Sequence, residues 1–255
     1  MTPKFVFIIP YRDRVQHKHF FDLHIKHVLE DISQNQYEIY YSHQNDKRLF
    51  NRGSMKNVGF IAIKNKYPED YKNITFVFND IDCLPYRKNL IDFPTSIGTI
   101  KHFYGFKHVL GGIVSITGND FEKINGFPNF WTWGYEDNVL NKRALQNNIK
   151  IDRSNFYSIH SPDILHFYHG NKRIHDLNQD DKNVSNNNGI NSIIDLNYEI
   201  DNTNQMIQVK SFHIKNDIKI NKKYLKNVDL ENNNYINDKK TKNQICKDSR
   251  FKMKL

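Results

Sequence analysis

Acidic side chains follow an apolar run in the stretch "FVFNDIDCLP", which ends in Asp80, Ile81 and Asp82. Alternate side chains of a β-strand point to the same side, so the two carboxylates are expected to lie together. The carboxyl end of a strand in an open α/β sheet is where ligands usually bind. Hard carboxylate oxygens there suit Mn²⁺ or Mg²⁺ on phosphates. An ordinary acidic turn would have the same letters, and the motif alone leaves both interpretations open.

A second acidic pair, Glu136 and Asp137, directly follows both tryptophans of the chain in "FWTWGYEDNVLNKR". Trp131 is expected in the core, whereas Trp133 lies between threonine and glycine and is expected on a bendable loop. Flat aromatic surface beside carboxylates is the chemistry of sugar recognition, because ring C–H groups contact the indole face and hydroxyls contact the acids. The stretch therefore favours a carbohydrate ligand.

Two histidines in "LHFYHG" could bind a metal ion. His166 and His169 are three residues apart, and they can reach one cation if the chain bends after a strand. Imidazole nitrogen binds Mn²⁺ and Zn²⁺ well. The chain has twelve histidines, so a chance surface pair is the alternative.

Arginines beside aromatic residues occur twice. Arg12 and Arg14 in "PYRDR" follow the first apolar run, where guanidinium groups could hold a diphosphate and Tyr11 could stack on a base. "FNRGS" at 50–54 repeats this combination. The alternative is that these arginines are simply solvated on loops and bind no ligand. Because the same combination occurs on two loops, we favour ligand binding over this alternative.

The elements that would position these clusters alternate between strands and helices over roughly the first 150 residues, the pattern of an α/β sheet. Strands are expected at 4–10, 37–42, the apolar part of 73–85, after Gly111, and at 163–169, and again at 190–200 and 206–214. Helices are expected at 17–32, with Phe20, Leu23, Ile25 and Val28 near one side, at 51–65, in a short piece capped near Asn119 or Asp120, and from about Asp137.

Composition limits the possible classes of protein. The 255 residues suffice for one sizeable domain, no apolar run is long enough for a transmembrane helix, and the N-terminus does not resemble a signal peptide. Two distant cysteines argue for a reducing compartment. We therefore expect a soluble cytoplasmic protein, in the host cytoplasm if the source is viral.

The net charge of +9 is concentrated at the end of the chain. From residue 215 onward there are 12 Lys and Arg against 5 Asp and Glu, which leaves 25 against 23 for residues 1–214. A nucleic-acid-binding core is therefore not expected, although the basic tail could bind nucleic acid or an anionic membrane.

Residues 170–188 are polar and without periodicity, and we expect a flexible loop there and a poorly ordered tail at 215–255.

The sequence motifs described above, in this order, resemble those of the β-1,4-galactosyltransferase family, glycosyltransferase family 7, whose members are inverting enzymes with the GT-A fold. The matching motifs are "FIIPYRDR", "LFNRGSMKNVGF", "FVFNDIDCLP", "GGIVSITGNDFEKINGFPNFWTWGYEDNVLNKR" and "ILHFYHG". They run collinearly from residue 5 to about 170, and "NGINSIIDLNYEI" extends the likeness more weakly. The resemblance implies one catalytic domain at 1–214, built on a Rossmann-like mixed central sheet flanked by helices, with a lid loop at 170–188.

The resemblance also implies a role for each cluster. Asp137 would be the general base, Glu136 would hold sugar hydroxyls, and Asp82, His166 and His169 would ligate Mn²⁺, with Mg²⁺ as the alternative. The residues that would bind the UDP-sugar donor are Pro10, Tyr11, Arg12, Arg14, Phe50, Arg52, Asp80, Val109, Gly112 and Trp133. Tyr135 and Asn138 would contact the acceptor, a glycan or glycosylated molecule. The implied activity is transfer of galactose or N-acetylgalactosamine from its UDP-sugar to a hydroxyl, forming a β-linkage.

Three positions depart from well-known members of the family. His166 replaces a methionine, although other members use histidine. Asn138 stands where an aspartate often follows the base, and Val109 stands where many galactosyl enzymes have tyrosine. The smaller Val109 predicts space for the C2 substituent of N-acetylgalactosamine.

A catalytically inactive sugar-nucleotide or carbohydrate-binding module is the alternative function, and a metal-dependent hydrolase is a weaker one.

Overall fold

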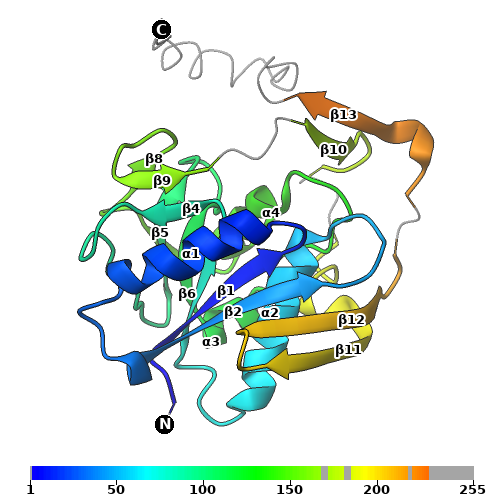
Figure 1. The fold of residues 1–255 in the computed structure, drawn as a ribbon. Helices are drawn as coiled ribbons and strands as arrows, with labels where there is room; N and C mark the ends of the chain where they lie inside the picture. Colours follow the sequence, from blue (N-terminus) through cyan, green and yellow to red (C-terminus); the bar gives the residue numbers. More distant parts are fainter. Residues whose placement is uncertain (1, 168–171, 181–184, 218–219, 230–255) are drawn as a thin grey trace, which may run out of the picture.

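A mixed β-sheet forms the centre of the computed structural model (Figure 1). The structure describes residues 2–167, 172–180, 185–217 and 220–229. In that part of the chain the sheet has nine strands, in the order β11-β12-β2-β1-β3-β6-β5-β7, with β8 beside β5. The strands are β1 (Phe5–Tyr11), β2 (Tyr37–Gln44), β3 (Thr75–Asn79), β5 (Thr99–Gly105), β6 (Ile113–Thr117), β7 (Lys150–Asp152), β8 (Tyr157–Ser158), β11 (Ile193–Asp201) and β12 (Met206–Ile214).

Strand β1 lies between two parallel neighbours, β2 and β3. Strand β12 continues the parallel part next to β2, whereas β6 is antiparallel to both β3 and β5. Since the carboxyl ends of parallel strands meet at one edge of a sheet, the segments that follow β1, β2 and β3 emerge together. The expected α/β class with a mixed, Rossmann-like central sheet is confirmed.

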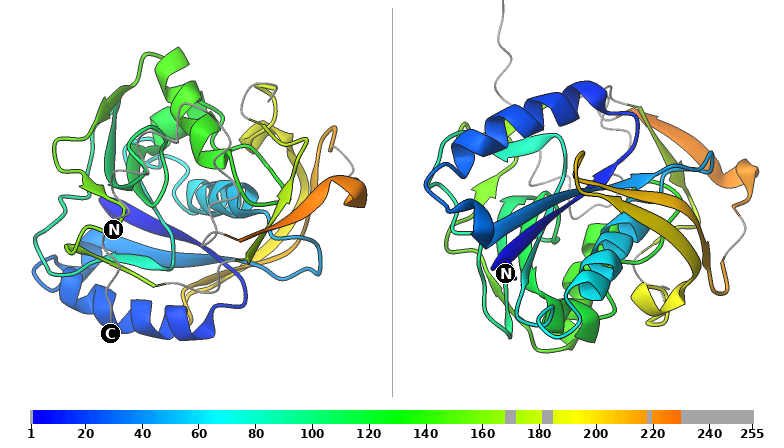
Figure 2. Two further views of the ribbon diagram at one scale, coloured as in Figure 1. Left: turned by 90° about the horizontal axis from the view of Figure 1, so that it is seen from above. Right: turned by 60° about the horizontal axis from the view of Figure 1, so that its bottom comes forward.

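Helices α1 (Val15–Val28) and α2 (Arg52–Lys66) cover opposite faces of this sheet (Figure 2). Successive side chains of β1 alternate between two cores, with Phe5, Phe7 and Ile9 packed on the α1 side and Val6 and Ile8 on the α2 side. Both faces of the strand are therefore buried, which explains its uninterrupted apolar sequence.

Glycine allows α2 to lie close against the sheet. A Cβ added to Gly59 would lie 2.3 Å from Ile8 Cγ2, well inside van der Waals contact. The predicted start of this helix is confirmed, because the Asn51 side chain accepts a hydrogen bond from the Ser54 amide at 2.8 Å. Helix α2 is thus fixed both along its axis and in its distance from β1.

Two local predictions were wrong. In α1 the buried side chains are Phe21, Ile25 and Val28, whereas Phe20 and Leu23 are exposed. Positions i, i+4 and i+7 form the stripe that faces the sheet, and the two mispredicted residues flank that stripe. Helix α3 (Gly118–Lys123) is capped by Thr117, whose hydroxyl accepts from the Asp120 amide at 3.2 Å, rather than by Asn119 or Asp120.

The remaining elements lie outside the central sheet. Helix α4 (Glu136–Gln146) follows the tryptophan stretch as expected. Strand β4 (Cys83–Pro85) pairs with β9 (Ile164–His166), and β10 (Lys172–Asp176) pairs with β13 (Leu225–Asp229). Single 3-10 turns, η1 (Gln34–Gln36), η2 (Ile190–Ser192) and η3 (Lys222–Tyr224), complete the list.

Strands β10 and β13 are a correction to the sequence analysis, which expected no regular structure in either segment. The two strands form an antiparallel ladder from Lys172–Asp229 to Asp176–Leu225, and the Leu177 amide donates to the Tyr224 carbonyl at 3.0 Å. Each segment is polar and has its partner about 50 residues away, so neither shows a strand pattern of its own. The first residues after the expected boundary at 214 also pack on the body, where Asp217 accepts from the Trp131 indole N–H at 2.9 Å.

Candidate active site

Arg52, in the first turn of α2, draws three of the predicted site residues together. Its Nη2 lies 2.6 Å from Asp80 Oδ2, and its Nη1 lies 2.7 Å from Glu136 Oε1 and 3.0 Å from Asp137 Oδ1. The guanidinium thus joins the turn after β3 to the start of α4. Arg52 was expected in the donor pocket, and the structure shows its guanidinium bound to the carboxylates.

Electrostatics differ sharply between these carboxylates. Burial alone would raise the pKa of Asp80, but Arg52 and Lys56 lower the pKa to about 2. For Glu136, burial raises the pKa, and the opposing effect of Arg52 is partly offset by the charge of Asp137. Asp80 is therefore ionised throughout the physiological range, held by cations from α2.

The turn before α4 aims the acidic pair at Arg52. Tyr135 has a left-handed backbone with φ of 64°, which is uncommon for a non-glycine residue, and it immediately precedes the helix. The Gly134 amide donates to Glu136 Oε2 at 3.0 Å. Glu136 and Asp137 then occupy the first turn, where the positive end of the helix dipole stabilises negative charge.

Asp137 lies directly over Gly111. A Cβ added to this glycine would be 2.2 Å from Asp137 Oδ2, so no other residue type leaves space for the carboxylate. The neighbouring Gly112 has φ of +71°, and its carbonyl accepts from the Asp80 amide at 3.0 Å. The double glycine between β5 and β6 therefore serves both segments: Gly111 leaves space for the Asp137 carboxylate, and Gly112 holds the backbone of Asp80.

Asp82 and His166 lie beside each other across the β4–β9 pair. Cys83 pairs with His166, and the Phe167 amide donates to the Asp82 carbonyl at 2.8 Å. Burial and the charge of Asp80 raise the pKa of Asp82, whereas His166 and Arg52 oppose that rise. The two side chains that the sequence placed at a metal are thus brought together by strand pairing.

The metal-ligand set is only partly within the described residues. His169 lies outside them, and among those that are described no group of three His, Cys, Asp or Glu side chains could hold an ion. The Tyr104 hydroxyl lies 2.8 Å from His166 Nδ1 and orients the imidazole, as the outer partners of metal-binding histidines do. The half-buried Asp82 carboxylate and the oriented imidazole are ligand types that fit Mn²⁺.

Several predicted donor residues lie at the carboxyl end of β1. Arg12 Nη1 donates to the Arg48 carbonyl at 2.6 Å, and its guanidinium lies 5.1 Å from the centre of the Phe50 ring. Tyr11 is buried edge-on against His43 and has little ring surface left for a base, and Pro10 is buried within the strand. The arginine-aromatic pair is the more accessible part of this group.

Arg14 lies further toward the metal ligands. Burial and the nearby charge of Arg173 lower the pKa of Arg14, against the opposing charge of Asp82. Two guanidinium groups beside a metal-type carboxylate provide the positive charge that a diphosphate requires. Arg173, on β10, was not singled out in the sequence, because its place beside Arg14 depends on chain segments about 160 residues apart.

The described part of the expected lid is docked on the tryptophan loop. The Trp133 amide donates to the Ile174 carbonyl at 2.9 Å, and the Trp133 carbonyl lies 2.7 Å from His175 Nδ1. Gln179 accepts from the Thr132 hydroxyl at 2.7 Å and donates to the Gly134 carbonyl. Trp133 remains 38% exposed, in agreement with its expected loop position, whereas Trp131 is buried.

Two residues expected to set specificity differ in exposure. Val109 is buried, and its carbonyl accepts from Arg153 Nη2 at 3.3 Å, whereas Asn138 is half-buried in the first turns of α4. Val109 lies two residues before Gly111 of the double glycine, and Asn138 directly follows Asp137 in α4.

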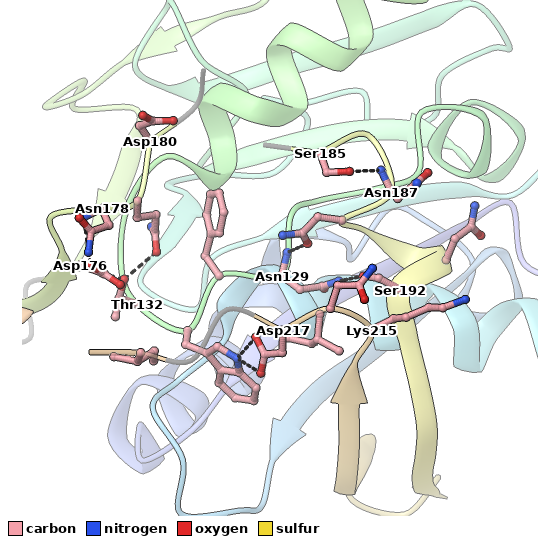
Figure 3. Close-up of a pocket in the computed structure, with 18 residues that line it drawn as sticks. Asn129, Thr132, Asp176, Asn178, Asp180, Ser185, Asn187, Ser192, Lys215 and Asp217 are labelled. Atoms are coloured by element: carbon pink, nitrogen blue, oxygen red, sulfur yellow. Dashed lines mark hydrogen bonds between the residues drawn. The ribbon is translucent and has the colours of Figure 1, made fainter. Parts of the chain in front are cut away.

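A cavity of about 640 Å³ is lined in part by the tryptophan stretch (Figure 3). Trp131, Thr132, Asp176 and Asp217 are among its lining residues, and none of the predicted catalytic, metal or donor residues lines it. Asp217 and the indole of Trp131 close one wall through their hydrogen bonds. The residues of the carboxylate cluster thus take no part in lining this cavity.

The arrangement defines a class of protein: an α/β domain with metal-type ligands and a carboxylate cluster at the carboxyl edge of a mixed sheet, as in nucleotide-sugar enzymes of the GT-A fold. A model of the N-terminal region of glycosyl transferase group 7 matches residues 2–91, and a model of the N-terminal domain of galactosyltransferase matches residues 95–170. The chain belongs to glycosyltransferase family 7, the β-1,4-galactosyltransferase family.

Individual relatives agree with this family. The chain is 32% identical to the xylosylprotein 4-β-galactosyltransferase of Caenorhabditis elegans over 71% of its own length and 64% of the relative, and 33% identical to human β-1,4-galactosyltransferase 1 over 60% and 39%. It thus spans less than two thirds of either relative. The catalytic domain of Drosophila β-1,4-galactosyltransferase 7 has the same fold, with a TM-score of 0.64 at 20% identity over 82% of this chain and 94% of that one.

No membrane-spanning candidate appears among the helices in the described ranges, since each is too short or too polar to cross a bilayer.

The residues that sequence reasoning missed are Lys56, Tyr104, Arg173, His175 and Gln179. Each acts through a contact with a distant segment, and a lysine or glutamine inside a helix or polar loop carries no spacing signal by itself.

Proposed function

We propose that this chain is a metal-dependent inverting glycosyltransferase that moves galactose from UDP-galactose to a hydroxyl of a sugar acceptor. The observation that carries the proposal is the meeting of Asp80, Glu136 and Asp137 on Arg52, beside Asp82 and His166, in a chain of family 7. A mutant of the Drosophila relative has been crystallised with manganese, UDP-Gal and xylobiose, which supports the same classes of ligand here.

Asp137 is the general base of the proposed reaction. Its Oδ1 is bound to Arg52, while its Oδ2 lies over Gly111 and can accept the proton of the acceptor hydroxyl. A base acts when it lies about 3 Å from the nucleophilic oxygen. That oxygen attacks the anomeric carbon from the face opposite the diphosphate, so one displacement converts an α-linked donor into a β-linked product.

Asp82 and His166, with His169, would hold a Mn²⁺ ion, with Mg²⁺ as the alternative. When bound, the metal stabilises negative charge on the leaving diphosphate. Arg12 and Arg14 contribute positive charge to the same diphosphate, and Asp80 contacts the ribose or the donor sugar. Trp133, which remains partly exposed beside the docked lid, covers the donor.

The donor sugar is proposed to include N-acetylgalactosamine as well as galactose. Val109 is a small, buried side chain two residues before Gly111, over which the Asp137 carboxylate lies. A bulky aromatic residue at this position would fill space that an N-acetyl group at C2 requires. Tyr135 and Asn138, on either side of the acidic pair, are proposed to contact the acceptor.

Transfer assays test the function directly. Radiolabelled UDP-galactose and UDP-N-acetylgalactosamine are offered with Mn²⁺ to N-acetylglucosamine, glucose and xylose acceptors. Asp137→Asn should abolish transfer and retain UDP binding within about threefold, because the amide keeps the shape but cannot take the proton. Asp92→Asn, at an exposed ion pair with Lys101, is the matched control and should transfer at the wild-type rate.

The outcomes separate the possible functions. UDP-sugar binding without transfer to any acceptor would indicate the inactive binding module. Release of free sugar in the absence of an acceptor would indicate a hydrolase. Full activity of Asp137→Asn would remove the assigned base.

A further inference from the structure

We propose that Lys56 is a positioning residue of the transfer site. Its ammonium group holds the carboxylates of Asp80 and Asp137 at a fixed separation from the buried side of the site. This inference rests on the proposed function. Lys56 lies in α2 with its side chain only 1% exposed, and its Nζ is 3.4 Å from Asp80 Oδ1 and 3.9 Å from Asp137 Oδ1. Its ammonium also lies 4.6 Å from the centre of the Phe127 ring.

A fully buried lysine requires compensation, because removing an ammonium from water costs several kcal/mol unless other groups replace the hydration. Here the compensating groups are the two carboxylates and the face of Phe127. They are the proposed donor contact and the proposed base. If the only role of this side chain were to fill the core, methionine would serve as well, because it has nearly the same length and no charge to compensate. The charge of Lys56 therefore points to a role with the two carboxylates.

Charge balance gives the lysine a second reason to be here. Asp80, Glu136 and Asp137 are three carboxylates, and Arg52 is the only other cation in the structure's described residues that forms an ion pair with any of them. Without Lys56 these three carboxylates would be paired with a single positive charge. Like charges at this separation repel, and the cluster would tend to spread.

Geometry assigns the lysine to positioning rather than to substrate contact. Arg52 and Lys56 are four residues apart on α2, so both cations project from the same face of one helix. Arg52 binds Asp80 with two nitrogens and Asp137 with one. Lys56 approaches the Oδ1 atom of both Asp80 and Asp137 from the buried side. Each carboxylate is therefore held by a second cation, which restricts rotation of the carboxylate group. Oδ2 of Asp137 is thereby kept over Gly111, toward the acceptor.

The test is Lys56→Met, which keeps length and removes the charge. We expect kcat to fall about 10- to 100-fold, since an error of about 1 Å in a reacting group has that effect. UDP affinity, measured by calorimetry, should stay within about threefold, and the melting temperature should be unchanged or higher, because apolar replacement of a buried charge is often neutral or stabilising. A purely structural lysine would instead lower the melting temperature and leave kcat unchanged.

Lys64→Met is the matched control, since Lys64 lies on the same helix in a half-exposed ion pair with Glu122 and should transfer normally when replaced. A crystal structure of Lys56→Met should show the Asp137 carboxylate displaced from Gly111 while Asp80 stays on Arg52. Wild-type kcat in Lys56→Met, or an Asp137 carboxylate that stays over Gly111, would overturn this inference alone. A wild-type protein inactive with every UDP-sugar would overturn the proposed function and this inference with it.

Discussion

Gly111 has only a hydrogen atom where any other residue would carry Cβ, and the carboxylate of Asp137 occupies that space. In Gly111→Ala the new Cβ would lie 2.2 Å from Asp137 Oδ2 and 2.6 Å from Cγ. Ordinary contact begins near 3.4 Å, so the oxygen must retreat by about 1.2 Å. Because Oδ1 is only 3.0 Å from Arg52 Nη1, the whole carboxylate cannot move without losing that bond.

The size of the effect follows from that displacement. Misplacing a reacting group by about 1 Å costs roughly 100-fold in rate, which corresponds to about 2.7 kcal/mol of transition-state stabilisation. We therefore expect kcat/KM for galactose transfer to fall about 100-fold in Gly111→Ala. UDP affinity should change by less than about threefold, because the added methyl meets the base rather than the arginines near β1. Initial rates with radiolabelled UDP-galactose and calorimetry with UDP measure the two quantities.

Gly98→Ala provides the control for a generic glycine substitution. Gly98 has φ of +86°, and an added Cβ would meet no atom within 4 Å. This variant should lose about 1 kcal/mol of stability through backbone strain and transfer at the wild-type rate. Wild-type kcat/KM in Gly111→Ala, or a loss no greater than in Gly98→Ala, would refute the reasoning.

Three further expectations concern donor choice, the lid and acid stability. Val109→Tyr should abolish use of UDP-N-acetylgalactosamine and keep galactose transfer, measured as the ratio of the two rates; an unchanged ratio would exclude this residue from donor choice. Gln179→Ala removes the bonds to Thr132 and Gly134, about 1 kcal/mol each, so limited proteolysis near residue 179 should be about 30-fold faster, and equal cleavage would contradict docking of the lid by this side chain. Burial and Arg153 lower the pKa of His102 to about 4 from its ordinary 6.5, so its neutral form contributes stability that is complete above pH 6.5 and is lost as pH falls toward 4. The loss is about 3 kcal/mol; urea unfolding at pH 7 and pH 4.5 should show part of it in the wild type and less in His102→Gln, and equal pH dependence in the two would refute it.

The sequence predicted the part of this site that depends on strand ends and motif letters. Asp80 and Asp82 follow β3 as expected, and Glu136 and Asp137 begin α4. Local signals suffice there, because an apolar run ending in acids determines both the element and its terminus.

Features that depend on contacts between distant segments were not predictable. The role of Arg52 as the centre of the carboxylates requires α2, the turn after β3 and α4 to meet, and nothing near residue 52 indicates this. Lys56 lies within a helix whose pattern is largely apolar. A lysine there would be expected to point to solvent, because lysine is almost never fully buried. The error in α1, where Phe21 rather than Phe20 is buried, has the same origin, since adjacent phenylalanines can be distinguished only by the sheet that packs on them.

The ladder between β10 and β13 has a practical consequence for protein production. A polypeptide shortened to end at residue 214 would keep β10 but lose the only strand that pairs with it in the described ranges. The backbone N–H and C=O groups along Lys172–Asp176 would then be open to other chains, and such edges promote intermolecular pairing. Shortened forms should therefore self-associate at high concentration, and sedimentation or light scattering would reveal dimers and larger species that the longer polypeptide does not form.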